Sequence, residues 1–401
     1  MKRAAVFLCL LFQLLLTSCQ GSGSAGDIPV SLETFQPTVS QPEEETCVPD
    51  FSQSEQIPEL PTELESDGLI LARTLTLEEQ VGQLFLARCP ETGALEDIQT
   101  YYLGVYILFG RDFKNDTPES LSLKLSEYQQ EACVPMLLAV DEEGGSVVRI
   151  SYYPAYRERK FYSPRYLYGQ GGLSVVLETE KEKCQLLKSL GINVNLAPVC
   201  DITTDPNAFL YYRSLGQTPE ITAEVISSMV HTMSEYSVGS VLKHFPGYGN
   251  NADTHVGIAV DDRTLEELEG CDLLPFAAGI EAGCGAILVS HTILNCFDSE
   301  YPASLSPEVH TYLRDIMKFD GVIMTDDLVM QAITDQYGAG EAAVLAVLAG
   351  NDLLCSSEYQ IQYRAVLDAV KSGRISRDVL EQAAGRVLQW KYELGLLKKV
   401  V

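Results

Sequence analysis

Two apolar runs of the sequence end in carboxylates that could take part in chemistry. Residues 322–325 lead into Asp326-Asp327, and residues 136–140 lead into Asp141. A carboxylate at such a position can act as a nucleophile. Side chains alternate along a strand, so one of Asp326 and Asp327 should face the interior of the fold and the other should not. Both could instead cap the following helix, but two adjacent carboxylates at a strand end favour a chemical role.

A glycine-rich segment carries a second candidate, an Asp-x-His pair. In an extended loop, residues i and i+2 point the same way, so Asp253 could orient His255 as a general acid and base. The same pair could simply stabilise the loop. Just upstream, Lys243 and His244 end another apolar run. Because such neighbours are costly inside a fold, binding sugar hydroxyls or a carboxylate explains them better than packing does.

Eight short apolar or β-branched segments must position these residues. They are residues 83–87, 105–109, 136–140, 192–198, 239–242, 286–290, 322–325 and 352–355. Strands that are apolar on both faces are typical of parallel sheets. Eight such units alternating with helical patterns predict a (β/α)₈ barrel, in a single catalytic domain over residues 61–401. The candidates then fall at the C-terminal ends of strands, where barrel active sites lie. An open doubly wound sheet is the alternative, although no Gly-x-Gly-x-x-Gly motif follows the first strand.

Four helix starts can be read directly from the sequence. Capping boxes begin at Thr76 and Thr264, each with Glu three residues later. Thr218-Pro219-Glu220 and Ser306-Pro307-Glu308 place an N-cap residue before a proline in the first turn. These signals separate the predicted strands.

Taken together, the motifs resemble those of family 3 glycoside hydrolases, in the β-N-acetylhexosaminidase branch. The resemblance covers about residues 70–395, and its most specific part is Lys243-His244-Phe245-Pro246-Gly247 followed by Asp253-x-His255. The other matching segments are Leu75 to Phe85, Asp141-x-Glu143-Gly144-Gly145-x-Val147-x-Arg149, Asn195-Leu196-Ala197-Pro198-Val199-x-Asp201, Arg213-Ser214-Leu215-Gly216, and Gly321 to Met330.

The resemblance implies hydrolysis with retention of the anomeric configuration, without a metal or other cofactor. By motif position Asp326 would be the nucleophile, His255 the acid/base and Asp253 its partner. The residues that would hold the terminal sugar are Asp141, Arg149, Arg213, Lys243 and His244. Asp327 follows the nucleophile position and has no role carried over to it.

The branches of this family differ in where the acid comes from. In many members a second domain supplies a glutamate. Here the sequence ends soon after the eighth unit, so we expect the barrel's own loop to supply His255. Imidazole titrates near neutrality and suits both the acid and the base step of a retaining mechanism.

The sequence also departs from the family pattern. Glu142, Ser146 and Tyr248 stand where glutamine, arginine and often histidine are expected. Residues 151–172 are rich in tyrosine and arginine. This segment could be an aromatic platform for a sugar or peptide, or a surface insertion packed on the barrel. The departures concern the choice of substrate more than the reaction.

The N-terminus is typical of a bacterial lipoprotein. Residues 1–18 combine a basic start with a short apolar stretch, and Leu16-Thr17-Ser18-Cys19 resembles a lipidation signal. An ordinary secretory signal with an incidental cysteine is the alternative. Residues 19–60 are acidic and rich in Gly, Ser and Pro, which predicts a disordered tether. We therefore expect an exported protein, anchored to the outer face of a membrane through lipid on Cys19.

Composition excludes several classes of function. The chain has 28 Lys and Arg against 56 Asp and Glu, a net charge of −28, which disfavours nucleic acid as a partner. Five histidines argue against a His-rich metal site. The nine cysteines that follow Cys19 are scattered in apolar stretches, which predicts buried thiols rather than a disulfide scaffold.

The sequence therefore predicts a membrane-tethered exo-β-N-acetylglucosaminidase. Its substrates would be cell-wall muropeptides or amino-sugar oligosaccharides, and no obligate protein partner is implied. Three alternatives stay open: a β-glucosidase, a phosphorylase of the same family, and a non-catalytic sugar-binding lipoprotein.

Overall fold

The computed structural model describes residues 65–203, 205–251, 257 and 259–398. The predicted signal sequence 1–18, the tether 19–60 with Cys19, and the pair Asp253 and His255 lie outside the described residues. The other predicted site residues lie within them.

Eight parallel strands of the described chain form a nearly closed barrel. They are β1 Phe85–Arg88, β2 Val105–Leu108, β3 Leu137–Val140, β4 Val194–Asn195, β5 Gly239–Phe245, β7 Ala286–Val289, β9 Val322–Thr325 and β10 Leu354–Ser356. Their order is β10-β1-β2-β3-β4-β5-β7-β9, and a parallel bridge from Met324 to Leu353 brings its two ends together. Each predicted segment overlaps one strand, so the barrel is confirmed and the open-sheet alternative is wrong.

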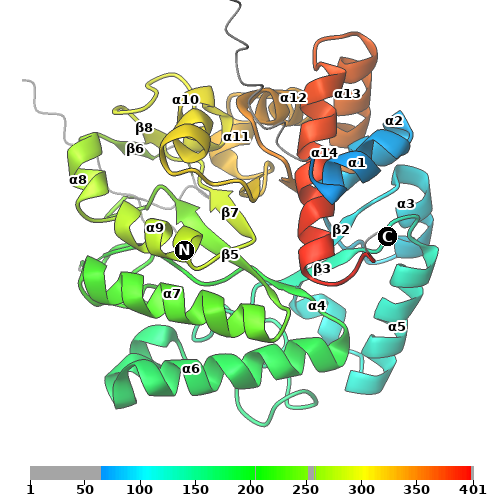
Figure 1. Ribbon diagram of the computed structural model, residues 1–401. Coiled ribbons are helices and arrows are strands. Elements are labelled where there is room, and N and C mark those ends of the chain that lie inside the picture. The colour runs from blue at the N-terminus through cyan, green and yellow to red at the C-terminus, as the bar shows by residue number, and fades with distance from the viewer. Residues whose placement is uncertain (1–64, 204, 252–256, 258, 399–401) are drawn as a thin grey trace, which may run out of the picture. The chain divides into compact units, whose positions relative to one another are not determined.

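Helices surround the barrel (Figure 1). The α-helices are α1 Asp67–Thr74, α2 Leu77–Gln83, α3 Ala94–Tyr101, α4 Gly110–Phe113, α5 Pro118–Glu131, α6 Pro164–Leu190, α7 Pro219–Glu235, α8 Leu265–Glu269, α9 Leu273–Glu281, α10 Pro307–Thr311, α11 Gln331–Thr334, α12 Ala339–Ala349, α13 Tyr359–Lys371 and α14 Arg377–Glu393. The predicted capping boxes at Thr76 and Thr264 are present. Thr218 and Ser306 cap α7 and α10, each with proline in the first turn.

Two short strands lie outside the barrel order. They are β6 Val260–Asp261 and β8 Ile293–Leu294, which pair in parallel with each other. The first and last helices of the described chain, α1 and α14, pack against each other (Figure 1). This contact brings the N-terminal and C-terminal segments of the barrel domain together. In the part of the chain that the structure describes, no helix is both long and apolar enough to span a membrane.

Strand alternation directs one set of side chains into the barrel. The strands contribute alternate residues to a single apolar interior, with two positions from most strands and one each from β1 and β5. On the first, third, fifth and seventh strands around the barrel, the last such residues are Leu86, Ala139, Val241 and Met324. Two positions further on, at the C-terminal ends of these strands, the inward side chains become charged, and these charges begin the functional site.

The opposite end of the barrel is closed by the indole of Trp390, on α14. Trp390 is buried and packs with the interior of the barrel. A Cβ atom added at Gly285 would lie 1.9 Å from the indole nitrogen, and one at Gly239 would lie 2.7 Å from the ring. These two small residues, which precede or begin strands, leave the space that the indole fills.

Candidate active site

A ring of four charged side chains surrounds the C-terminal end of the barrel. Its members come from alternate strands, and they are Arg88 on β1, Asp141 after β3, Lys243 on β5 and Asp326 after β9. All four line the same cavity. In barrels of this type, alternate strands contribute the inward residues of one layer. The sequence predicted three members of this charged ring and missed Arg88.

The intervening strands supply an apolar floor. Its residues are Ile107 on β2, Leu196 after β4, Leu288 on β7 and Cys355 on β10. Floor and charged ring line a cavity of about 920 Å³, which Arg149, Arg213 and His244 also line. The volume is typical of small-molecule sites, and the many charged and polar groups over an apolar base suit a polar ligand. The structure thus brings together all six predicted site residues that it describes.

Three charged side chains of the cavity wall, Asp141, Lys243 and Arg213, form one network with the buried Glu143 behind them. The ammonium of Lys243 lies 2.8 Å from Asp141 Oδ1 and 2.7 Å from Glu143 Oε1. Arg213 binds the other side of Glu143 through two hydrogen bonds, Nε to Oε2 at 3.0 Å and Nη2 to Oε1 at 2.7 Å. This planar, two-point contact fixes the guanidinium in one orientation.

Electrostatics favours the charged forms of Glu143, Lys243 and Arg213. Burial by itself would raise the pKa of Glu143, but Lys243 and Arg213 outweigh it and hold that pKa well below its usual value. Burial would lower the pKa of Lys243, yet the carboxylates of Asp141 and Glu143 hold it above its usual value. Glu143 likewise raises the pKa of Arg213 against the effect of burial.

The orientation and tautomer of His244 follow from its two neighbours. Its Nδ1 lies 2.8 Å from Asp201 Oδ2, and its Nε2 lies 3.2 Å from Arg213 Nη2. An arginine can only donate, so Nε2 accepts and the proton sits on Nδ1, where it binds Asp201. Asp201 also accepts hydrogen bonds from the backbone N–H groups of His244 and Tyr248. The imidazole is thus held in one tautomer at the wall of the cavity.

The two carboxylates at the end of β9 have different surroundings. Asp327 accepts hydrogen bonds from the Ser357 hydroxyl at 2.6 Å and from the N–H groups of Val329 and Ser357. It therefore ties the end of β9 to the segment after β10. Asp326 accepts a hydrogen bond from the Asp327 N–H at 2.8 Å. Both line the cavity, which corrects the expectation that only one would face it, although Asp327 is engaged in holding the turn.

Arg149 reaches the charged ring from a loop that Glu142 organises. The buried carboxylate of Glu142 accepts the backbone N–H groups of Arg149 at 2.7 Å and Ile150 at 2.8 Å. Arg149 then places Nη2 3.5 Å from Asp141 Oδ2. The other oxygen of Glu142 accepts hydrogen bonds from Ser151, so both carboxylate oxygens face donors, whereas a glutamine could accept with only one atom. This departure from the family pattern therefore suits the loop that Glu142 organises.

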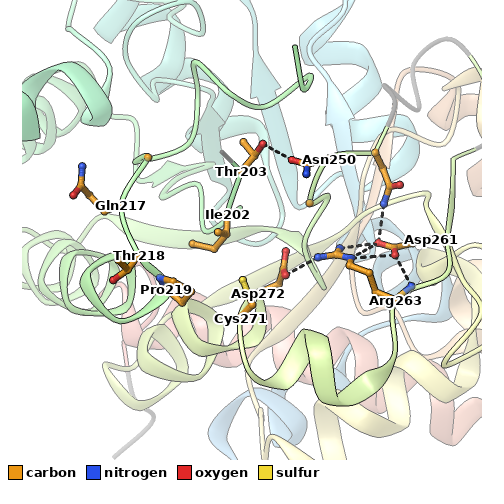
Figure 2. A pocket seen from close by; sticks show the side chains of 13 residues that line it. Ile202, Thr203, Gln217, Thr218, Pro219, Asn250, Asp261, Arg263, Cys271 and Asp272 are labelled. Carbon is orange, nitrogen blue, oxygen red and sulfur yellow. Dashed lines mark hydrogen bonds and ion pairs between the residues drawn. The ribbon is translucent and has the colours of Figure 1, made fainter. Parts of the chain in front are cut away.

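The predicted acid/base pair, Asp253 and His255, lies outside the described residues, but the chain on both sides of it is fixed. Asn251 Nδ2 binds Asp261 Oδ2 at 2.7 Å, which links the two sides. Arg263 pairs with Asp261 at 2.7 Å and Asp272 at 2.6 Å, and donates to the Gly247 carbonyl at 3.0 Å. Figure 2 shows Arg263 between the two carboxylates, beside a second cavity of about 810 Å³.

Asp272 is the buried end of this arrangement. Burial raises its pKa to about 6, although Arg263 acts in the opposite direction. A Cβ atom added at Gly247 would lie 2.5 Å from Asp272 Oδ1, and Gly247 has φ +117°. Only glycine satisfies both the close approach and the backbone conformation, which explains the glycine after Phe245-Pro246.

Sequence reasoning missed four residues of the site and its supports: Arg88, Glu143, Asp201 and Arg263. A signal existed for Arg88 and Glu143, since each lies two residues after an inward-facing residue, Leu86 and Asp141 respectively. The roles of Asp201 and Arg263 depend on contacts between distant segments. No pattern within one segment could have revealed them.

The tyrosine- and arginine-rich segment 151–172 does not line the cavity. Tyr153 and Tyr156 pack against the hydrophobic core, and Arg157 pairs with Glu182 at 2.8 Å. The aromatic residues that line the cavity are Phe109, Phe209 and Tyr212. These contacts favour the surface insertion over the aromatic platform.

The described cysteines have no disulfide partners, and five of the eight are buried: Cys89, Cys184, Cys200, Cys284 and Cys355. For these five the prediction of buried thiols is confirmed, whereas Cys133 is exposed. Among the described residues, no group of three or more His, Cys, Asp or Glu side chains is arranged to hold a metal ion.

Comparisons with known proteins agree with this geometry. Residues 76–390 match the glycosyl hydrolase family 3 N terminal domain. The chain is 33% identical over 302 residues to a beta-hexosaminidase of Xylella fastidiosa strain M23, covering 73% of this chain and 87% of that protein. It is 29% identical over 334 residues to beta-hexosaminidase A of Pseudoalteromonas piscicida, covering 76% of this chain but only 55% of that protein.

A solved structure of a family 3 enzyme also matches this chain. The chain superimposes on a glycoside hydrolase family 3 beta-N-acetylglucosaminidase from Paenibacillus sp. str. FPU-7 with a TM-score of 0.75 and 32% identity. The match covers 82% of this chain and 64% of the Paenibacillus chain.

Replacing Glu143 with glutamine should destabilise the fold strongly. Glu143→Gln leaves Arg213 and Lys243 buried with only Asp141 to balance them. Breaking a buried ion pair in this way costs about 3–5 kcal/mol. Urea unfolding at pH 7 measures the loss. Glu182→Gln is the matched control, because it removes the same charge from an exposed pair with Arg157 and should cost about 1 kcal/mol or less.

The difference in unfolding free energy between the native protein and Glu143→Gln should depend on pH in one direction. The folded state holds the pKa of Glu143 below its unfolded value of 4.5, so its stabilisation is fully present above about pH 4.5. It is lost as the pH falls below that value. The gap in stability between the native protein and Glu143→Gln should therefore narrow in acid. A gap that stays constant from pH 7 to pH 3 would contradict this assignment.

Proposed function

The chain belongs to glycoside hydrolase family 3, and from this premise we propose that it removes terminal β-linked N-acetylglucosamine from glycans with retention of configuration. The observation that carries the proposal is the charged ring, which sets Asp326 beside groups suited to hold a sugar. The natural substrates would be cell-wall muropeptides or amino-sugar oligosaccharides. The chain matches only 55% of the length of the Pseudoalteromonas piscicida relative. The activity of the whole protein is therefore part of this proposal.

The terminal sugar would be held by the buried network. Asp141 can accept from sugar hydroxyls, while Lys243, Arg149 and Arg213 donate to them. His244 presents Nε2 toward Arg213 and is held by Asp201, so its ring forms a fixed wall of the cavity. Because these groups already contact one another, they are in place before the sugar arrives.

The first chemical step would be attack by Asp326. Its carboxylate oxygen forms a bond to the anomeric carbon while the glycosidic carbon–oxygen bond breaks. The leaving oxygen takes a proton from His255, which Asp253 would orient. The products of this step are a glycosyl ester on Asp326 and a free aglycone.

The second step would reverse these roles. Neutral His255 accepts a proton from water, whose oxygen attacks the anomeric carbon from the side that the aglycone left. The ester bond to Asp326 breaks, and the carboxylate is regenerated. Two inversions give overall retention.

Export and membrane attachment are part of the proposal. The signal-like segment 1–18 and Cys19 support a lipid anchor, and the acidic segment 19–60 supports a flexible tether. Such an enzyme would act on glycans outside the cytoplasm.

Asp326→Asn should abolish turnover while leaving the protein folded. Nitrophenol release is measured from the β-N-acetylglucosaminide beside the β-glucoside. The native protein should hydrolyse the first substrate and not the second, and the variant should lose at least about 1000-fold in kcat because the nucleophile is gone. Asp320→Asn, on an exposed residue before the same strand, is the matched control and should keep full activity.

Other outcomes would point to other functions. Turnover of the β-glucoside alone would favour a β-glucosidase. Absence of turnover with both substrates, in a folded protein that still binds N-acetylglucosamine, would favour the sugar-binding alternative.

The pH profile of kcat/KM should be bell-shaped. The first step needs Asp326 ionised and His255 protonated, so the alkaline limb should follow a histidine pKa, about 6.5 when unperturbed. In His255→Ala this limb should disappear together with most of the activity. Survival of the limb in that variant would assign the acid to another group.

Cys19→Ser should release the protein from membranes. Fractionation of cells that express the full chain should find the native protein with the membrane and the variant in the soluble or secreted fraction, because the anchor needs the thiol. An unchanged membrane fraction for Cys19→Ser would remove the lipid-anchor proposal.

A further inference from the structure

Arg88 is the member of the charged ring that the proposed mechanism does not use. It ends β1 and lines the cavity that Asp141, Lys243 and Asp326 line. In the strand order, β2 separates it from β3, and β10 separates it from β9. Arg88 therefore lies between the residue that would bind hydroxyls, Asp141, and the residue that would attack the sugar, Asp326.

The other cations of the cavity each have a carboxylate partner. Lys243 pairs with Asp141 and Glu143, and Arg213 pairs with Glu143. Arg149 lies 3.5 Å from Asp141. Arg88, by contrast, makes no hydrogen bond and no ion pair with any described residue. Its Nε is buried without a partner.

The contact that Arg88 does make is with an aromatic ring. Its Cζ lies 4.6 Å from the centroid of Phe109, and the Cζ of Arg149 lies 5.4 Å from the same centroid. Two guanidinium groups therefore share one phenyl ring. Stacking on the ring uses the face of each guanidinium and leaves the N–H groups at its edge for a ligand.

The surroundings give no other reason for this charge. The chain has twice as many acidic as basic residues, so a cation without an ion pair is unexpected in it. Burial raises the pKa of Asp112, and the charge of Arg88 opposes this slightly through space, but the two side chains form no ion pair. The carboxylate of Asp112 instead accepts the Phe109 N–H at 2.7 Å. A partly buried charge of this kind is costly unless something else neutralises it.

We propose that Arg88, stacked on Phe109 beside Arg149, is a specificity-determining residue that binds an anionic substituent of the terminal sugar. This rests on the proposed function of the cavity as a sugar site. A guanidinium binds a carboxylate, sulfate or phosphate through two parallel hydrogen bonds, which a neutral hydroxyl cannot match. The substrate class is therefore an acidic β-linked amino sugar, in addition to plain N-acetylglucosamine.

Two positions on the sugar could carry the anion, and they can be separated by substrate. A 3-O-lactyl carboxylate, as in N-acetylmuramic acid, places it next to C2. A 6-O-sulfate places it on the other side of the ring. The probes are the 4-methylumbelliferyl β-glycosides of N-acetylglucosamine, of N-acetylmuramic acid and of 6-O-sulfo-N-acetylglucosamine. The methyl ester of the lactyl group is the neutral control of equal shape.

The measurement is the ratio of kcat/KM for each anionic substrate to that for the neutral one. Arg88→Gln should lower this ratio about 10- to 100-fold for at least one anionic substrate, the range expected for a charge-assisted two-point contact. Arg88→Lys keeps the positive charge but loses the paired N–H groups of the guanidinium, so its ratio should lie between those of the native protein and Arg88→Gln. Arg111→Gln, which removes one charge from the neighbouring segment outside the cavity, should leave the ratio unchanged.

Three results would overturn the inference. The first is that Arg88→Gln lowers kcat/KM equally for neutral and anionic substrates, and the second is that the native protein turns over neither anionic substrate. The third is that the native protein has the same kcat/KM for the muramide and its methyl ester, while Arg88→Gln has no effect on the sulfated substrate. If the protein hydrolyses none of the glycosides, the catalytic proposal fails but Arg88 can still be tested. Calorimetric titration with free N-acetylglucosamine, N-acetylmuramic acid and N-acetylglucosamine 6-phosphate then decides it. A preference for an acidic sugar that Arg88→Gln removes would sustain the inference, and equal affinities would reject it.

Discussion

The buried contact of Glu143 with Lys243 and Arg213 is the interaction on which the rest of the site depends. Glu143 neutralises two cations that could not otherwise be enclosed, and it fixes where each of them points. Lys243 in turn holds Asp141, and Arg213 sets the tautomer of His244. Removing this carboxylate would leave uncompensated charge at the heart of the cavity. The site is therefore built around Glu143, which does not line the cavity itself.

The barrel explains why these charges meet. Alternation along four strands carries the inward side chains from an apolar layer to a charged one within two residues, at the end where the strands stop. The apolar floor from the other four strands strengthens the interactions above it, since a low dielectric increases both attraction and the cost of an unpaired charge. Arg88 differs from the other cations of the cavity, because each of them pairs with a carboxylate and Arg88 pairs with none among the described residues.

The sequence was sufficient for the barrel, because buried parallel strands leave apolar runs that any reader can count. It was sufficient for Asp141, Lys243 and Asp326, because each follows such a run directly. It did not reveal Glu143 or Arg88, although the two-residue period contained both. It could not reveal the pairing of Asp201 with His244, or of Arg263 with Asp272, because segments far apart in the chain make these contacts. For the segment 151–172 the composition left a binding platform and a surface insertion both open, and the structure favours the insertion because Tyr153 and Tyr156 pack on the core and the segment does not line the cavity.

We propose that this arrangement makes Asp326 the nucleophile of a retaining reaction. The most direct measurement incubates the protein with a slowly hydrolysed 5-fluoro derivative of the aryl β-N-acetylglucosaminide and maps the attached sugar by peptide mass spectrometry, while NMR follows the anomer first released from the unmodified substrate. The account predicts a sugar ester on Asp326 and initial release of the β anomer. A label on another residue, or initial release of the α anomer, would contradict it.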